Sequence, residues 1–116
     1  MKYVLLIYSD ESAAPMPETP EAQQVFDEYL AFTTRIAERG ISRGGEALHD
    51  SGAATTVRVV DGEVVTSEAP AVDSREALGG FYLIEVPDKK AAIAVAAELP
   101  GARYGAVEVR PVWVWE

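Results

Sequence analysis

Two stretches of the chain are apolar at consecutive positions instead of at every second one. They are residues 2–8, K-Y-V-L-L-I-Y, and residues 81–86, F-Y-L-I-E-V. A strand with one solvent-exposed face alternates apolar and polar side chains, whereas a strand covered on both faces is apolar throughout. Both stretches are too short for an ordinary helix and rich in strand-forming residues. We therefore predict two strands that are covered on both faces, with Phe81–Val86 central in its sheet.

The apolar pattern changes to helical spacing between residues 20 and 38. Thr19 fits an N-cap, Pro20 the first helical position, and Gly40 the left-handed residue beyond the end. A second helix should have Asp88 as its N-cap and end at Leu99-Pro100-Gly101. The predicted buried face of the first helix consists of Ala22, Val25, Phe26, Tyr29, Leu30, Thr33, Ile36 and Ala37.

Turn residues separate the shorter strands. Ile41–Leu48 should form a strand, and Gly44-Gly45 within it indicates a bulge or a close approach of two backbones. Two further strand-like runs, Thr55–Val60 and Glu63–Thr66, flank Asp61-Gly62. That pair is preferred in a two-residue type I′ turn, so these runs predict a hairpin.

A last strand is predicted at Gly105–Arg110, and Pro111 argues that it lies at the edge of the sheet. Without the hairpin the order is β-α-β-β-α-β, which predicts one ferredoxin-like α+β domain over residues 1–116 with an inserted β-hairpin. Two helices cover only one face of such a sheet, although two strands are apolar on both faces. Since closed two-fold dimers dominate among homo-oligomers, we expect a homodimer formed through the second face.

Composition narrows the choice of partners. The 116 residues carry a formal net charge of -9, so the average field repels phosphate backbones and anionic membranes. We therefore expect no nucleic acid and no membrane partner. The absence of cysteine excludes disulfides and thiolate chemistry, and fits a cytoplasmic protein. The apolar run Val4–Tyr8 is shorter than the core of a signal peptide, and no stretch is long enough to span a membrane.

Several segments together resemble the YCII-related family, also called the DGPF-domain family. They follow one another over nearly the whole chain: K-Y-V-L-L-I-Y at 2–8, Y-L-A-F-T at 29–33, G-G-E-A-L at 44–48, A-T-T-V-R-V at 54–59, L-G-G-F-Y-L-I at 78–84 and V-E-V-R-P-V at 107–112. The resemblance implies a ferredoxin-like domain that pairs into a dimeric α+β barrel. It also implies a bacterial-type protein of unknown function, linked to stress responses through neighbouring sigma-factor genes.

Two departures from the family pattern affect its proposed chemistry. The Asp-Gly-Pro-Phe motif that names the family falls on Glu68-Ala69-Pro70-Ala71, so only the proline is kept. In shorter relatives a histidine of the first helix is proposed to work with the motif acid, and its position falls on Tyr29 here. A tyrosine with an ordinary pKa of about 10 is a poor general base at neutral pH. The resemblance therefore implies a related pocket without the proton-transferring pair.

Glu68 is the sharpest candidate for a site residue, because a rigid loop places it where the family has its acid. The alternative is a solvated turn glutamate, just as Tyr29 is either a ligand-facing group or an ordinary core aromatic. We expect Glu68 and Tyr29 to reach one cavity, joined by Tyr8 or Tyr82, while His49 stays outside. The favoured function is binding of a small molecule; the alternatives are acid/base catalysis through Glu68 and a structural or regulatory role without a pocket.

Two further motifs carry expectations about metals and partners. Glu46, His49 and Asp50 form E-x-x-H-D, but an odd separation puts Glu46 and His49 on opposite faces of a strand. Because a metal needs three or four converging ligands, we expect neither a metal site nor a cofactor. Trp113 and Trp115 share one face of an extended C-terminal arm, which suits a dimer interface; packing on the parent sheet is the alternative.

Overall fold

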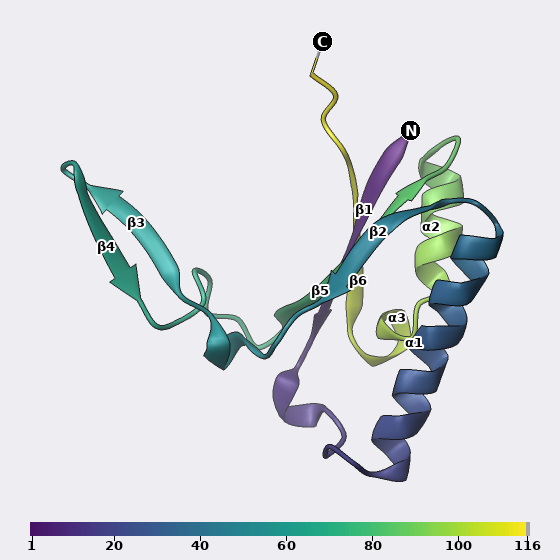
Figure 1. The fold of residues 1–116 in the computed structure, drawn as a ribbon, viewed down its shortest axis with the longest axis horizontal. Helices are drawn as coiled ribbons and strands as arrows, with labels where there is room; N and C mark the ends of the chain where they lie inside the picture. Colours follow the sequence, from purple (N-terminus) through teal and green to yellow (C-terminus); the bar gives the residue numbers. More distant parts are fainter. Residues whose placement is uncertain (116) are drawn as a thin grey trace.

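An antiparallel four-stranded sheet carries all the longer helices of the chain on one face (Figure 1). The computed structural model describes residues 1–115. The strand order β2-β5-β1-β6 is consistent with the predicted ferredoxin-like α+β fold. The main elements are β1 (Lys2–Ser9), α1 (Pro20–Glu38), β2 (Ser42–Ala47), β5 (Ala77–Glu85), α2 (Lys89–Ala97) and β6 (Ala106–Pro111). The remaining ones are two 3-10 turns, η1 (Glu11–Ala13) and η2 (Ser51–Ala53), the short helix α3 (Gly101–Tyr104) and the strands β3 (Thr56–Val60) and β4 (Glu63–Ser67).

The core lies between the sheet and the helices. Every second residue of β1 points into it, because side chains alternate along a strand. Tyr3, Leu5 and Ile7 are buried there, and Leu5 is fully inaccessible. The helices contribute Phe32, Ile36, Ala92, Val95, Ala96 and Leu99 to the same core.

The predicted buried face of α1 is partly wrong. Phe32 was not in the predicted set, yet it is fully buried, whereas Phe26 and Leu30 are 61% and 55% exposed. Two neighbouring rows of apolar side chains run along this helix, one through Tyr29, Phe32 and Ile36 and the other through Phe26 and Leu30. Both rows fit a helical repeat, so spacing alone does not decide which of them faces the sheet.

At one glycine of each pair, the backbone of the neighbouring strand lies too close to admit a side chain. At Gly45 a Cβ atom would lie 2.5 Å from the carbonyl oxygen of Phe81, and at Gly80 it would lie 2.9 Å from that of Glu46. The register between β2 and β5 shifts between Ser42 and Gly45, which confirms the predicted bulge. Because Gly80 pairs within the ladder, β5 begins at Ala77, four residues before the predicted start of the strand.

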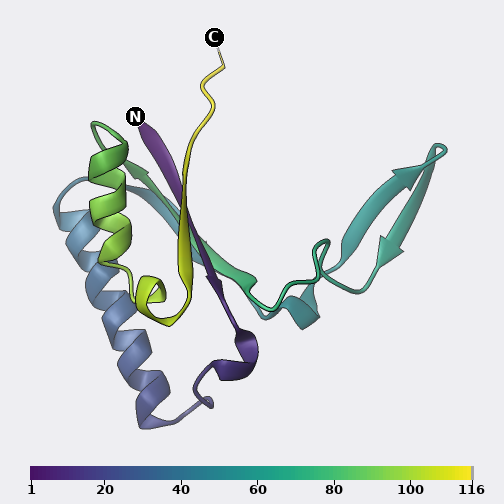
Figure 2. The same ribbon diagram turned by 180° about the vertical axis from the view of Figure 1, so that it is seen from behind.

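The face of the sheet away from the helices has no layer of its own. Val4, Leu6, Phe81 and Leu83 alternate with the core residues along β1 and β5 and are partly exposed. Figures 1 and 2 show α1, α2 and α3 together on the opposite side. Within the single chain, the expectation that these two strands are covered on both faces is therefore met on one face only.

The hairpin β3–β4 stands away from the sheet (Figure 2). Its turn has φ of 51° at Asp61 and 80° at Gly62, so both central residues lie in the left-handed region, as a type I′ turn requires. The radius of gyration is 16.1 Å, compared with about 13 Å for a compact domain of this length. The two longest dimensions of the chain, 47 Å by 47 Å, exceed its thickness of 18 Å because the hairpin β3–β4 extends to the side.

Candidate functional site

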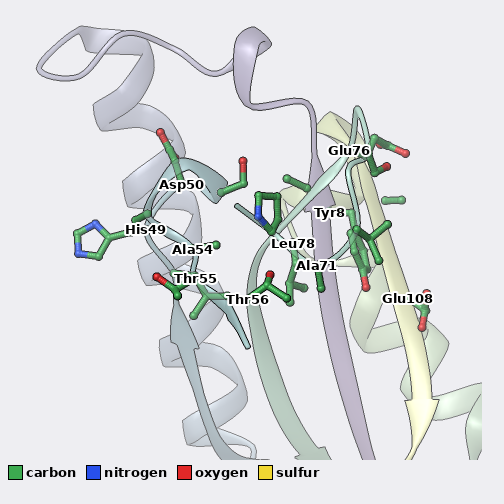
Figure 3. A pocket seen from close by; sticks show the side chains of 18 of the residues that line it. Tyr8, His49, Asp50, Ala54, Thr55, Thr56, Ala71, Glu76, Leu78 and Glu108 are labelled. Carbon is green, nitrogen blue, oxygen red and sulfur yellow. The ribbon is translucent and has the colours of Figure 1, made fainter. Parts of the chain in front are cut away.

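The larger cavity of the chain has a volume of about 1100 Å³ and lies at one end of the sheet. Its floor is formed by the ends of β1, β5 and β6, and its walls by the segments 48–57 and 70–77 (Figure 3). Tyr8 occupies the floor, where it pairs with Leu78 on one side and Ala106 on the other. This cavity therefore lies on the face of the sheet that the helices do not cover.

Apolar side chains and acidic groups line this cavity together. Leu48, Val57, Val72 and Leu78 are its large aliphatic residues. The charged side chains of the lining are the carboxylates Asp50, Glu76 and Glu108, and the lining includes neither lysine nor arginine. Such a surface suits a molecule with an apolar body and without negative charge.

Hydrogen bonds tie the two walls of the cavity to each other. The Thr56 hydroxyl donates to the carbonyl oxygen of Ala69 over 2.6 Å, and the Thr55 hydroxyl donates to Glu68 over 3.0 Å. Both threonines belong to the lining, and so do Pro70 and its neighbour Ala71. The segment Glu68–Ala71 is thus held against the cavity from one side.

Asp10 and Glu11, which directly follow β1, also bind residues of the two wall segments. The carboxylate of Glu11 accepts hydrogen bonds from the Ser51 hydroxyl and from its backbone N–H, the latter over 2.7 Å. These bonds hold the pKa of Glu11 below its ordinary value. Asp10 accepts a hydrogen bond from Ser12 and is 3.0 Å from the Arg75 guanidinium, and both interactions lower the pKa of Asp10. The two residues after β1 therefore each hold one residue of a wall segment: Glu11 holds Ser51, and Asp10 holds Arg75.

A smaller cavity of about 360 Å³ lies on the other side of the sheet, beneath α1. Tyr29, Thr33 and Tyr82 line it, and the hydroxyls of Thr33 and Tyr82 form a hydrogen bond of 2.8 Å. The Tyr82 ring also contacts Phe32 edge to face, with ring centroids 5.0 Å apart. Burial raises the pKa of Tyr29, and the neighbouring Tyr82 acts in the same direction. Tyr29 is therefore a neutral hydroxyl group at physiological pH.

The structure does not bring the four predicted pocket residues to one cavity. Tyr8 lines the larger cavity, Tyr29 and Tyr82 line the smaller one, and Glu68 is exposed and belongs to neither lining. The cause is strand parity: Tyr82 pairs with Leu5 on the helix-covered face, whereas Tyr8 is three residues further along β1 and points to the other face. A binding role for each of these residues stays a prediction.

His49 is placed differently from its expectation, because it is among the residues that line the larger cavity. Its ring points away from Tyr8 and Leu78 (Figure 3). Within residues 1–115, no group of three or more His, Asp or Glu side chains is placed to hold a metal ion. His49 and Asp50 of the E-x-x-H-D segment therefore line the larger cavity, whereas Glu46 lines the smaller one.

Several residues of the larger cavity were not predicted. Glu108, Leu78 and Val72 belong to segments that were interpreted only as strand or loop. The register of the sheet brings Glu108 to the side of Leu6, on the same face as Tyr8. The alternation of Val107, Glu108 and Val109 indicates an acid on the face opposite to the core, so this signal was present in the sequence.

A family model described as the YCII-related domain matches residues 1–116. The chain belongs to the YCII-related family. This YCII-related protein is also similar to the uncharacterized protein R00369 of Rhizobium meliloti (strain 1021), with 30% identity over 118 residues, all of this chain and 95% of that protein. In the described part of the chain, no helix has the length and apolar character needed to cross a membrane.

Proposed function

We propose that this YCII-related protein binds a small organic molecule in the larger cavity. The observation that carries the proposal is the volume of about 1100 Å³ combined with its lining of aliphatic side chains and a few polar groups. Ligand sites in proteins are commonly concavities of roughly 300–1,000 Å³ with that kind of lining. The segment Glu68–Ala71, which falls at the position of the family motif and keeps only its proline, borders this cavity through Pro70 and Ala71.

The charge of the lining restricts the ligand. Asp50, Glu76 and Glu108 are present without a lysine or arginine among the lining residues, and the whole chain carries a net charge of -9. An anionic ligand would be repelled by both the local and the average field. We therefore propose an apolar ligand that is neutral or carries an amine.

Three probes with the same aromatic body test this preference: 2-phenylethylamine, 2-phenylethanol and phenylacetate. We expect the amine and the alcohol to raise the unfolding temperature and phenylacetate to have the smallest effect. A ligand at a hundred times its dissociation constant should stabilise the folded state by about 2.7 kcal/mol. Equal shifts for all three probes, or none for any of them, would contradict the proposal.

A matched pair of charge changes locates the site. Glu108→Gln removes a carboxylate from the cavity and should lower the affinity for 2-phenylethylamine relative to 2-phenylethanol. Glu63→Gln makes the same change at the far end of the hairpin, outside the lining, and should leave both affinities unchanged. Titration calorimetry of the two variants compares them at the same net charge.

Acid/base catalysis through Glu68 lacks comparable support in this structure. The Glu68 side chain is exposed and accepts a hydrogen bond from Thr55. Tyr29, which stands at the position of the family's histidine, lines the smaller cavity beneath α1. Glu68 belongs to neither cavity lining, so the two groups do not meet at one cavity, and we propose binding without a reaction.

A further inference from the structure

The smaller cavity exists because the sheet carries small residues beneath α1. Tyr82, whose ring contacts α1, is paired with Gly45. Ile7, which is buried on the same face, is paired with Gly80, and Gly80 is paired in turn with Ala47. Directly paired residues share a face of the sheet, so two glycines and an alanine leave space under the helix. The resulting volume of about 360 Å³ is within the range of known ligand sites, which begins at roughly 300 Å³.

This cavity opens to solvent between α1 and the edge strand β2. Thr33 of α1 and Ala47 of β2 are lining residues that are exposed. Tyr29 and Tyr82 are lining residues that are half-buried, so they lie deeper than this entrance. A molecule that enters between the helix and the strand therefore reaches the two tyrosine side chains.

The walls of the smaller cavity carry no charged side chain. Glu46 is the one charged residue of the lining. It is paired with Phe81 and comes between two residues that face α1, so its side chain points to the other face of the sheet. A charged molecule buried without a partner loses far more hydration energy than a neutral one, so these walls favour a neutral ligand. The polar side-chain groups that remain are the hydroxyls of Ser9, Tyr29, Thr33 and Tyr82.

The hydrogen bond between Thr33 and Tyr82 has one possible direction. The Thr33 hydroxyl donates its single proton to the carbonyl oxygen of Tyr29 over 2.9 Å, since a carbonyl oxygen only accepts. The Tyr82 hydroxyl must therefore donate to Thr33 over the 2.8 Å that separates the two oxygens. Because its proton is used in this way, the Tyr82 oxygen presents a lone pair that can accept a hydrogen bond from a ligand.

The Tyr29 hydroxyl has the opposite capacity. The backbone N–H of Gly101 hydrogen-bonds to its oxygen, and burial raises the pKa of Tyr29, so the hydroxyl keeps its proton at neutral pH. Among the hydrogen bonds of residues 1–115, this proton has no acceptor. Tyr29 therefore presents a donor to the same cavity in which Tyr82 presents an acceptor.

We infer that the smaller cavity is a second ligand site, which takes a compact neutral molecule that carries a hydroxyl group. The hydroxyl group of the ligand accepts a hydrogen bond from Tyr29 and donates one to Tyr82, while its apolar part contacts Ile7 and Ala47. A carboxylate cannot donate and an ammonium group cannot accept, so neither satisfies both tyrosines. The two cavities lie on opposite faces of the sheet, and this inference does not depend on the proposed function of the larger one.

Two probes, benzyl alcohol and benzyl methyl ether, separate the two hydrogen bonds. The alcohol donates and accepts, whereas the ether only accepts. Tyr82→Phe removes the acceptor of the site, so the affinity for the alcohol should fall about three- to tenfold and the affinity for the ether should not change. Tyr29→Phe removes the donor and should weaken both probes by a similar factor. Tyr8→Phe is the matched control in the lining of the larger cavity and should weaken neither.

Backbone amide signals in NMR spectra measure both the affinity and the location of binding. In wild type, benzyl alcohol should cause saturable shifts at Gly45, Gly79 and Gly80, which line the smaller cavity. Gly62 in the turn of the hairpin should not shift. The same spectra show whether each variant keeps the native fold, which we expect because phenylalanine retains the ring of each tyrosine.

Three results would overturn the inference: no saturable shift at the three glycines, equal losses of alcohol and ether affinity in Tyr82→Phe, or an equal loss of alcohol affinity in Tyr8→Phe. Tyr82→Phe should leave the affinity for 2-phenylethylamine unchanged, since the amine is the probe proposed for the larger cavity. If wild type does not respond to the amine but binds benzyl alcohol as expected, the proposed function fails and the second site stands.

Discussion

At the scale of single residues, the glycine pair in β5 offers the sharpest test of the backbone packing. An added Cβ at Gly80 would lie 2.9 Å from the carbonyl oxygen of Glu46, whereas at Gly79 the nearest such atom is 4.0 Å away, on Ile7. Gly80→Ala should lower the free energy of unfolding by about 1–3 kcal/mol, because β2 must move. Gly79→Ala should be close to neutral. Chemical denaturation measures both, and equal losses would contradict the close approach.

The bonds of Glu11 give a prediction about pH. Hydrogen bonds from Ser51 lower the pKa of the Glu11 carboxyl, so the charged form is favoured in the folded state. The stabilisation is present above the ordinary pKa of the group and is lost as pH falls through its folded value. The protection factors of the amides of residues 51–53, which are exchange rates corrected for the intrinsic base-catalysed rate, should therefore fall on acidification.

Glu11→Gln should reproduce that lower protection at neutral pH and remove most of the pH dependence of the protection factors. Glu21→Gln is the control, because this acid lies in the first turn of α1 and away from η2. If the protection factors of residues 51–53 have the same pH dependence in Glu11→Gln as in wild type, another group is responsible.

At the scale of the elements, the periodicity of α1 predicts a helix but does not decide which of its two apolar rows faces the core. Phe32→Ala should cost about 3–5 kcal/mol of stability, since this side chain is fully buried. The same change at Phe26, which is 61% exposed, should cost far less in the single chain. Thermal or urea unfolding compares the two, and a larger effect at Phe26 would mean that the other row faces the core.

The sequence was sufficient for elements whose signals are local. Thr19 caps α1 and Asp88 caps α2 through their side chains, as predicted, and Asp61-Gly62 forms the predicted turn. The short helix α3 was missed, because Pro100-Gly101 was interpreted only as the end of α2. The pocket expectation failed for a different reason: Tyr8 and Tyr82 belong to paired strands, and their faces depend on a register that no single segment specifies.

At the scale of the whole molecule, the C-terminal arm offers a fluorescence test of the homodimer that the sequence predicts. Trp113 and Trp115 are the only tryptophans in the sequence, and both side chains are largely exposed in the single chain. If they lie near the contact, as the sequence predicts, their emission should shift to longer wavelength when the protein is diluted. Emission that is independent of concentration across the dissociation of the dimer would place them outside the interface.

The edges of the hairpin β3–β4 affect how the protein associates with other chains in solution. With only two strands, β3 and β4 each leave one edge of backbone donors and acceptors unpaired, and such edges are templates for pairing with other chains. Arg58, Asp61 and Glu63 place charges along or beside these edges, which opposes that pairing. The hairpin is therefore a part of the fold whose unpaired edges can template β-aggregation, and such pairing between chains is favoured at higher protein concentration.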